Sequence, residues 1–582
     1  MQSKKFIDNE LVIDGSSVWL LQGHEGFSYS DGTESEHYLE EVLREAVDLS
    51  SSSEELEASI RDWISEYHLS SKRAQLLSGF NFERSMSVLE VGCGCGAITR
   101  FLGETFEQVI SIEGSISRAR IARLRTRDLE SVSVVCGPFQ EIKFSKKFDI
   151  VFCIGVYEYS GSFVGGPNPY DAVLAYLNSI LAPGGILVLA IENQFGLKYF
   201  NGAQEDHLGK RFVGLEGYHR ISEGVRTFGK TELENNLKKH FENVQFYYPF
   251  PDYKLPSCIV NEEFMLSGKA GEIISQVESR NGPSNQSLWD EYSVIHELSK
   301  NKALDFFSNS FLVVAGKGKP DRLQFDQRAI MFSSGRRKLF STKTKVLFTS
   351  NKSSVVSKTS RWSIGGNELE NLKMVDCDSP WVDQASIFTA ISFRARRQGL
   401  SLDEIFSPCK PWLEYLEKNL IMINGARVLD GGHIDTIWSN VYMVAEGCMV
   451  VDREWVWKDH VPLNVVVIRA IYHFIMKVDS WRYCATPLRQ RSGIRLISAI
   501  GQAVGVKLDA DDFKLFVEIE SDFQSLVRGI AKRKIEINIR WYLSDRVTFN
   551  YSNRMKAYWR HFSNIIRRKL FGLRGFLALN KP

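Results

Sequence analysis

The chain has 582 residues, of which 44% are hydrophobic and 24% charged, so it is long enough for several domains and has an ordinary globular composition. These proportions exclude a disordered chain, a collagen-like repeat and a small disulfide-rich protein. The formal net charge is +2, but residues 540–582 hold ten Lys or Arg and one Asp, a net +9, which leaves −7 elsewhere. Positive charge concentrated at one end predicts an anionic partner surface there. It does not favour nucleic-acid binding by the body of the protein.

The sequence contains no uncharged apolar run of roughly 18 residues, the length that a membrane-spanning helix needs. The first ten residues, MQSKKFIDNE, also lack an apolar run of signal-peptide type. We therefore expect a cytoplasmic protein. The nine cysteines show no paired CxxC spacing, so we expect reduced thiols rather than a zinc or redox site.

Short strands alternate with helical stretches from residue 87 onward. The strands are rich in Val, Ile and Leu, which is typical of parallel strands covered by helices on both faces. This rhythm predicts an α/β fold with a doubly wound, mainly parallel sheet. Two later segments, 244–250 and 310–317, are expected to extend the sheet, and because 310–317 follows a long interval the sheet is expected to close with an inserted strand. The first five predicted strands are 87–92, 108–113, 131–136, 148–155 and 184–192.

A glycine-rich turn follows the first of these strands, where Glu90, Gly92, Gly94 and Gly96 read ExGxGxG. Without Cβ atoms the turn can be tight, and its amides and the next helix can approach a ligand closely. Glu113 ends the following strand, where a carboxylate can accept hydrogen bonds from two ribose hydroxyls. We therefore expect these five residues to bind a nucleoside-containing cofactor.

Two cofactors fit this turn. Gly92, Gly94 and Ala97 also satisfy the GxGxxA pattern of dinucleotide sites, which makes NAD the rival ligand. The acidic Glu90 ahead of the glycines and the LAPGG turn at 181–185 favour S-adenosylmethionine (SAM) instead.

Residues from about 63 to 317 resemble a family of bacterial class I methyltransferases. Members of that family are found with polysaccharide and lipopolysaccharide biosynthesis genes, and many are fused to glycosyltransferase or kinase-like modules. The motifs that carry the resemblance are YHLSSKRAQLL (67–77), VLEVGCGCGAITRFLGE (88–104), IEGSISRARIARLRTRDL (112–129), IGVYEYS (154–160), AIENQFGLKYFNGAQEDHLG (190–209) and PFPDYKLPS (249–257).

The resemblance implies a Rossmann-like class I methyltransferase fold, with SAM as the cofactor and Gly155 of the IGVYEYS motif among the residues that bind it. It also implies a surface glycan, such as O-antigen, or its lipid-linked precursor as the acceptor. Glycosyltransferases of the same pathway are further expected partners.

His207 is the candidate general base for a sugar hydroxyl. An imidazole near its working pKa can take the proton while a neighbouring carboxylate orients the ring, and Glu205 and Asp206 lie beside it. His207 and Asp206 are therefore the predicted catalytic residues of the methyltransferase. The alternatives are a purely structural His207, or an acceptor that is already a phosphate and needs no base.

Four more residues are predicted to contact the acceptor or the sulfonium. Glu192 and Asn193 follow the fifth strand, and Tyr157 and Glu158 follow the fourth, at the carboxyl edge where open α/β sheets bind ligands. The alternative for Asn193 is a role in capping its own loop.

A second set of residues resembles the catalytic segment of aminoglycoside phosphotransferases and other kinase-like folds. HIDTIWSN (433–440) has the form HxDxxxxN. The resemblance implies that Asp435 is the base, that Asn440 and Asp452 hold Mg²⁺, and that Lys358 binds ATP phosphate. A glycine-rich loop is missing, and Glu368 or Glu370 would have to pair with the lysine, so an inactive kinase fold is the alternative.

The C-terminal sequence predicts a basic amphipathic helix. In residues 555–573 the aromatic and aliphatic residues recur at helical spacing, with most of the Lys and Arg elsewhere. Such a helix can lie on an anionic membrane, which predicts peripheral association with the inner membrane face. Packing on the kinase-like domain is the alternative.

Together these observations predict a SAM-dependent O-methyltransferase of a bacterial surface glycan, followed by an α+β kinase-like domain that phosphorylates the same acceptor. The rival is a scaffold whose two folds only bind glycan or a partner. The predicted boundaries are an N-terminal extension over 1–54, a methyltransferase domain over 55–318 with a helical insertion at about 257–308, a kinase-like domain over 325–500, and a helical region with the basic tail over 501–582.

Overall fold

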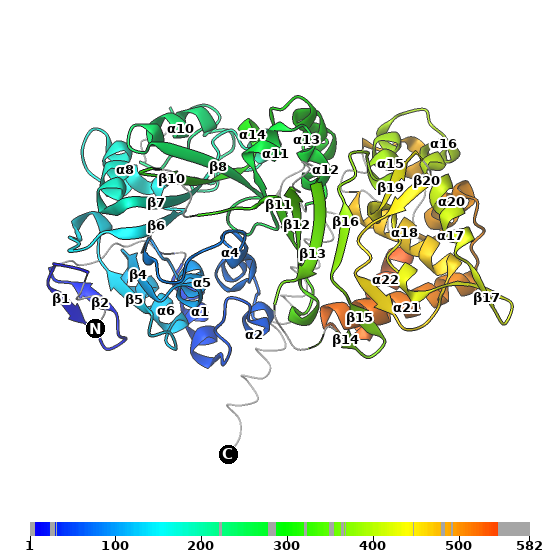
Figure 1. The fold of residues 1–582 in the computed structure, drawn as a ribbon, viewed down its shortest axis with the longest axis horizontal. Helices are drawn as coiled ribbons and strands as arrows, with labels where there is room; N and C mark the ends of the chain where they lie inside the picture. Colours follow the sequence, from blue (N-terminus) through cyan, green and yellow to red (C-terminus); the bar gives the residue numbers. More distant parts are fainter. Residues whose placement is uncertain are drawn as a thin grey trace, which may run out of the picture. The chain divides into compact units, whose positions relative to one another are not determined.

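The computed structural model describes residues 6–544, apart from 24–29, 31, 220–223, 278–286, 319–322, 349–353, 363–365, 367, 446, 479–482 and 490–492. The chain divides into two compact units, Met1–Phe332 and Ser333–Pro582 (Figure 1). The first unit therefore ends later than the predicted boundary at 318. It also includes the residues that the sequence predicted to form a separate N-terminal extension.

Five parallel strands form the centre of the first unit, as the sequence predicted. Their order in the sheet is β5-β4-β3-β6-β7, so the chain starts in the middle, moves to one edge and then crosses to the other side. This reversal beside β3 creates the crevice in which open α/β sheets bind ligands. The strands are β3 (Ser87–Val91), β4 (Gln108–Glu113), β5 (Val132–Cys136), β6 (Phe148–Ile154) and β7 (Leu181–Glu192).

The sheet continues beyond β7 with antiparallel strands. β10 (Ser310–Gly316) lies between β7 and β8 (Asn243–Phe250), which confirms the predicted inserted strand. β9 (Cys258–Asn261) and β11 (Gln327–Phe332) follow it.

The N-terminal residues complete the opposite edge of the sheet. β2 (Trp19–Leu21) pairs in parallel with β5, and β1 (Leu11–Ile13) pairs with β2. These two strands are too short for their sequence pattern to have predicted them.

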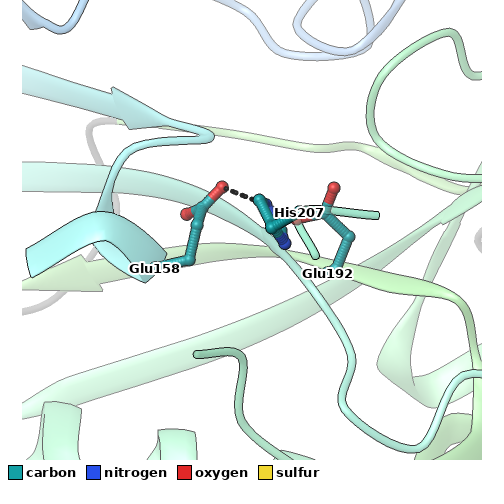
Figure 2. Close-up of side chains that lie close together, drawn as sticks. All are labelled: Glu158, Glu192 and His207. Atoms are coloured by element: carbon teal, nitrogen blue, oxygen red, sulfur yellow. Dashed lines mark ion pairs between the residues drawn. The ribbon is translucent and has the colours of Figure 1, made fainter. Parts of the chain in front are cut away.

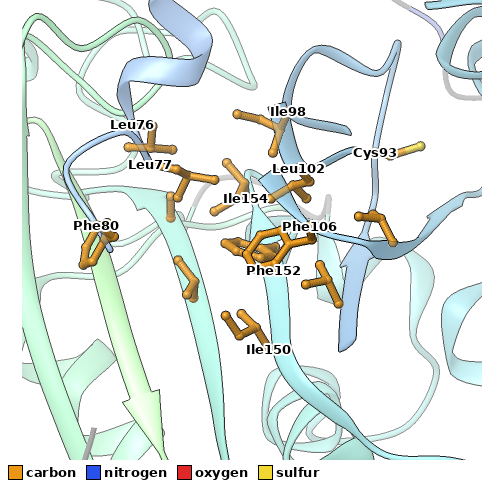
Figure 3. Close-up of a cluster of buried hydrophobic side chains, with 14 of the residues drawn as sticks. Leu76, Leu77, Phe80, Cys93, Ile98, Leu102, Phe106, Ile150, Phe152 and Ile154 are labelled. Atoms are coloured by element: carbon orange, nitrogen blue, oxygen red, sulfur yellow. The ribbon is translucent and has the colours of Figure 1, made fainter. Parts of the chain in front are cut away.

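Helices cover the sheet and enclose its core. Ile98 and Leu102 of α5 (Ala97–Thr105) belong to one buried cluster with Phe152 of β6, and Leu76 and Phe80 join it (Figure 3). This apolar layer fixes the turn between β3 and α5. The other helices of the unit's first 240 residues are α1 (Thr33–Glu45), α2 (Glu54–Ala58), α3 (Trp63–Leu69), α4 (Lys72–Gln75), α6 (Ile116–Arg125), α7 (Ser160–Phe163), α8 (Pro169–Ile180), α9 (Leu197–Phe200) and α10 (Lys230–Lys238).

Residues 257–308, predicted to be a helical insertion, begin with strand β9 and then form short helices. Those helices are α11 (Glu262–Leu266), α12 (Ala270–Ile274), α13 (Glu291–Lys300) and α14 (Leu304–Phe307).

The second unit mixes short antiparallel strands with a helical half. β12 (Thr342–Phe348) and β13 (Ser354–Ser360) form one hairpin, and β19 (Val441–Val444) and β20 (Gly447–Val450) form another. α18 (Leu463–Lys477) packs against α20 and α21. The remaining elements are β14 (Glu368–Leu369), β15 (Leu372–Met374), β16 (Cys377–Pro380), α15 (Ile387–Arg396), α16 (Leu402–Phe406), α17 (Lys410–Lys418), β17 (Ile421–Ile423), β18 (Ala426–Leu429), β21 (Trp455–Trp457), β22 (Val461–Pro462), α19 (Thr486–Arg489), α20 (Gly493–Val504), α21 (Ala510–Arg528) and α22 (Lys532–Leu543).

Two other sequence expectations concern the chain as a whole. Among the described residues, no helix is both long and apolar enough to cross a membrane. All nine cysteines are free thiols. The predicted basic helix over 555–573 lies outside the described residues.

Candidate active site

A cavity of about 260 Å³ opens in the first unit at the carboxyl ends of the parallel strands. Backbone forms much of one wall, because Gly92, Gly114, Gly137 and Gly155 follow four of these strands directly. Aromatic side chains from α3 and from the loops complete the enclosure. The other lining residues are Trp63, Ile64, Tyr67, His68, Ile112, Glu113, Arg118, Phe139, Gln140, Val156, Glu158, Tyr159, Phe163, Asp206, His207, Tyr253 and Lys254.

Two of the predicted cofactor glycines lie on this wall. Gly92 has φ +72°, and a Cβ added there would lie 2.4 Å from Cγ2 of Val156. Gly155 has φ +71°, and its Cβ would lie 2.6 Å from the Tyr253 hydroxyl. Both positions therefore need glycine for conformation and for space. A wall without side chains lets a nucleoside cofactor lie close to the backbone.

Gly94 and Gly96 shape the turn behind the wall and are not among the lining residues. A Cβ on Gly96 would lie 2.7 Å from the Cα of Ala122, so this glycine allows close packing of α6. A Cβ on Gly94 would lie 2.8 Å from Nη2 of Arg118.

The two predicted acidic cofactor residues have different environments. Glu113 lines the cavity, and its carboxylate accepts hydrogen bonds from the amides of Gly94 (2.7 Å) and Ser115 (3.0 Å). Glu90 faces away from the cavity and accepts hydrogen bonds from the hydroxyls of Thr99 and Ser111, both at 2.7 Å. Burial raises the pKa of Glu90 to about 7, even though these hydrogen bonds lower it. Glu90 therefore stabilises the glycine-rich turn from the side opposite the cavity.

His207, Glu158 and Glu192 lie close together, and we call these three residues the acceptor cluster (Figure 2). Glu158 and His207 also line the cavity. Nε2 of His207 lies 3.5 Å from Oε1 of Glu158 and 3.6 Å from Oε2 of Glu192. Glu192 ends β7, and Glu158 lies in the turn after β6, so adjacent parallel strands bring them together. The side chain of His207 is 6% exposed, and those of the two glutamates 1% or less.

The orienting partner of His207 is Glu205. Nδ1 of His207 lies 2.9 Å from Oε1 of Glu205, whose other oxygen accepts hydrogen bonds from the amides of His207 (2.8 Å) and Leu208 (2.7 Å). Burial lowers the pKa of His207, but the carboxylates of Glu192, Glu158 and Glu205 together raise it well above its usual range. The three carboxylates therefore favour positive charge at this position, which a protonated ring supplies when no other cation is present.

Asp206, predicted to be catalytic, turns toward lysines instead of His207. It forms ion pairs with Lys198 and with Lys254 (3.1 Å), and Lys254 also pairs with Glu192. Burial opposes ionisation, but these two lysines lower the pKa of Asp206 strongly. Asp206 therefore keeps two lysines in place at the edge of the cavity.

Two of the predicted acceptor residues, Tyr157 and Asn193, do not line the cavity and make structural contacts instead. Tyr157 is completely buried and stacks on Phe228, with ring centroids 5.5 Å apart, and it does not line the cavity. The side-chain amide of Asn193 donates to the carbonyls of Phe306 (2.8 Å) and Ser308 (2.7 Å), so it fastens its own loop.

The cavity includes residues that sequence reasoning missed. The ring of Tyr159 meets that of His207 edge-on at 5.2 Å. Tyr253 and Lys254 come from the loop after β8. All three residues lie inside the motifs IGVYEYS and PFPDYKLPS of the family resemblance, and these motifs were the sequence signal that could have identified them.

A second set of charged residues gathers in the second unit. Lys358 of β13 forms ion pairs with Asp452 and with Glu454 (3.1 Å), and Glu454 also holds Arg336 at 2.8 Å. The predicted partner Glu368 lies in strand β14 and pairs with Lys458 at 2.6 Å. Glu454, which is completely buried, is therefore the glutamate that pairs with Lys358.

The other two predicted kinase-like residues also contact each other. Nδ2 of Asn440 donates to Oδ2 of Asp435 at 3.2 Å and to its carbonyl at 3.0 Å. Asp435 forms an ion pair with the buried Arg469. Burial raises the pKa of Asp452, and the nearby charge of Asp435 raises it further. The two carboxylates therefore share one electrostatic environment.

Known proteins resemble the first unit. Residues 89–189 match the family model described as "Methyltransferase domain". The malonyl-[acyl-carrier protein] O-methyltransferase of Priestia megaterium is 24% identical over 193 residues, which cover 30% of this chain and 67% of that protein. The matched span contains the glycine turn, Glu113 and the central strands.

Solved structures were also found, with low TM-scores. A methyltransferase in complex with the Trm112 activator of Haloferax volcanii has 16% identity and a TM-score of 0.28, over 44% of this chain and 92% of that chain. CalS10, an amino pentose methyltransferase from Micromonospora echinaspora, has 27% identity and a TM-score of 0.17, over 20% and 46%. Because residues 89–189 match a methyltransferase domain and a cavity opens at the ends of its strands, this chain is a SAM-dependent methyltransferase with a class I methyltransferase domain.

Proposed function

We propose that this enzyme transfers the methyl group of SAM to a hydroxyl of a bacterial surface glycan or of its lipid-linked precursor. The cavity carries the proposal, because it is continuous from the glycine wall and Glu113 to Glu158 and His207. A cofactor on that wall and an acceptor at the acceptor cluster would share one enclosed space. The glycan class comes from the motifs of the sequence.

The chemistry to be catalysed is an in-line displacement, so alignment of the acceptor oxygen with the methyl carbon is the main task. A hydroxyl must also lose its proton as it attacks. The acceptor cluster is the group that we expect to hold and activate it, because Glu158 offers two buried oxygens that have no hydrogen-bond partner. Sugar hydroxyls are donors that would satisfy them.

The cluster favours a hydroxyl over a phosphate acceptor. Lys198 and Lys254, the lysines beside it, are both paired with acidic residues. A phosphate would bring further negative charge toward Glu158 and Glu192.

The test uses unmethylated surface polysaccharide, with its lipid-linked precursor, from a strain in which the gene is deleted. Purified enzyme and radiolabelled SAM should label a glycan hydroxyl, located by fragmentation mass spectrometry, and Glu113→Ala should label it far more slowly. Label that appears only on a phosphate, an amine or a carboxylate would contradict the proposal.

We also propose that the second unit transfers phosphate from ATP to the same acceptor. The observation that favours it is the gathering of Lys358, Asp452, Asn440 and Asp435. Asp452 and Asn440 carry the oxygen ligands that Mg²⁺ prefers. Lys358, which pairs with Asp452, supplies the positive charge that a nucleotide phosphate would need. Asp435 is occupied by its ion pair with the buried Arg469, which supports a binding module as the alternative.

We further propose that residues 551–582 bring the enzyme to the anionic inner face of the membrane, near the glycosyltransferases of its pathway. Vesicles containing anionic lipid should co-sediment with the full chain but not with a chain ending at residue 550. High salt should weaken the binding. Equal sedimentation of both proteins would contradict the proposal.

A further inference from the structure

The acceptor cluster has the composition and spacing of a cation site. Its three side chains come from three separate segments and offer two carboxylate oxygens and one imidazole nitrogen within 4.8 Å of one another. Figure 2 shows His207 between the two glutamates. Both glutamates are completely buried. Mixed nitrogen and oxygen ligands of this kind suit first-row divalent cations such as Mn²⁺ and Zn²⁺.

The distances fit a shared ion better than direct hydrogen bonds. Nε2 of His207 is 3.5 Å and 3.6 Å from the two carboxylate oxygens, whereas hydrogen bonds to nitrogen are about 2.7 to 3.2 Å long. Two ligand atoms that each lie about 2.1 Å from a metal are about 3.4 Å apart at a tetrahedral angle. The observed separations therefore leave room for an ion without rearrangement of the backbone.

Residues outside the acceptor cluster already orient its side chains, as a metal site requires. Glu205 binds Nδ1 of His207 at 2.9 Å, which leaves Nε2 facing Glu158 and Glu192, and a carboxylate behind a ligand histidine is a recurrent feature of such sites. Lys254 pairs with Oε1 of Glu192, so Oε2 is the oxygen that faces the cluster.

An independent observation points to a missing ligand. Neither carboxylate oxygen of Glu158 has a hydrogen-bond partner, although the side chain is completely buried. An ionised carboxylate in that state is costly, because it has lost water and its one ion pair, with His207 at 3.5 Å, is longer than a hydrogen bond. The same side chain faces the cavity, so whatever satisfies it enters from there.

We propose that Glu158, Glu192 and His207 form a divalent-cation site whose open positions face the cavity and take the acceptor hydroxyl. The second half of this statement rests on the proposed function. The cation is held by one oxygen of each glutamate and by Nε2 of His207, and the second oxygen of Glu158 is left for the acceptor. The ion would polarise the acceptor hydroxyl, and the second oxygen of Glu158 would take its proton. The hydroxyl oxygen would then bond to the methyl carbon as the methyl–sulfur bond of SAM breaks and S-adenosylhomocysteine leaves.

The experiment measures Mn²⁺ binding to chelator-treated full-length enzyme by calorimetry and electron paramagnetic resonance. All proteins carry Asp452→Ala, so that a proposed metal ligand of the second unit is absent throughout. We expect one Mn²⁺ per chain, with affinity at least about tenfold weaker in Glu158→Gln and in His207→Gln. Glu262→Gln, a carboxylate of the same unit outside the cluster, should bind as the parent does. SAM binding in each variant checks that it is folded.

The outcomes separate the two proposals. Absence of saturable Mn²⁺ and Zn²⁺ binding, or binding that both cluster variants leave intact, overturns the cation site. Glycan methylation that persists in excess chelator overturns it too and leaves the methyltransferase proposal standing. Metal binding that depends on the cluster, without any glycan methylation, supports the cation site and contradicts the proposal that a surface glycan is the acceptor.

Discussion

Nδ1 of His207 lies 2.9 Å from Oε1 of Glu205, while the adjacent Asp206 turns away to Lys198 and Lys254. Of the two acidic neighbours in the sequence, only Glu205 therefore orients the ring. Because Oε2 of Glu205 also accepts two backbone hydrogen bonds, the loop and the ring are fixed together. The acceptor cluster depends on this pairing.

Glu113 is expected to anchor the ribose of SAM. Its carboxylate is already held by the amides of Gly94 and Ser115, so it is positioned before the cofactor binds. Glu113→Ala should weaken SAM binding by about 1 to 3 kcal/mol through loss of charge-assisted hydrogen bonds. Titration calorimetry measures this, with Glu45→Gln on the exposed face of α1 as the control. Unchanged affinity would remove Glu113 from the cofactor site.

Gly96 is expected to matter for stability more than for ligand contact. Its φ is +84°, and a Cβ would lie 2.7 Å from the backbone of α6. Gly96→Ala should lower the free energy of unfolding by about 1 to 3 kcal/mol, the cost of a strained backbone conformation. Chemical denaturation measures this change. A variant as stable as the parent would show that the backbone at residue 96 and the neighbouring α6 adjust without cost.

Glu90 should make stability depend on pH. Burial raises its pKa to about 7, from an ordinary value of 4.5, so the folded chain binds a proton that the unfolded chain has released. Its contribution is fully present below pH 4.5 and is lost as the pH rises through 7, by up to about 3 kcal/mol.

Glu90→Gln keeps a side chain that can bond to Thr99 and Ser111 but cannot ionise. The free energy of unfolding should therefore fall less between pH 5 and pH 8 than it does in the parent. Glu45→Gln should leave the slope unchanged. If Glu90→Gln had the same pH dependence as the parent, burial would not be holding a proton on Glu90.

The second unit should bind ATP with Mg²⁺ if its charged cluster is a nucleotide site. Millimolar ATP and Mg²⁺ should raise the melting temperature, and Asp452→Ala should abolish the part of the shift that needs Mg²⁺. Asp378→Ala, an exposed carboxylate on the neighbouring β16, is the matched control. A parent protein without any shift would make this unit a glycan-binding or docking module.

The central strands and the glycine turn were predictable because their signals are local. Strands buried on both faces read as continuous apolar runs, and a turn that needs positive φ requires glycine, as at Gly92 and Gly155. The inserted β10 was also foreseen, since a strand-like segment followed the insertion. The edge strands β1 and β2 were missed because three residues carry no periodicity.

The partners of the site residues were less predictable, because sequence distance does not determine which side chains meet. Tyr157 and Tyr159 lie in one short turn, yet only the ring of Tyr159 reaches His207. Lys358 pairs with Glu454, which is 96 residues away, and not with Glu368. Such pairings depend on how distant elements pack, which no local pattern encodes.

The most direct test of the account is the single-turnover rate of methyl transfer from SAM to the unmethylated glycan in the parent and in His207→Ala. We predict a rate at least about a hundredfold lower in the variant, the usual scale for loss of the group that activates an acceptor, with SAM affinity nearly unchanged. A variant that transfers methyl at close to the parent rate would contradict the assignment of the acceptor cluster.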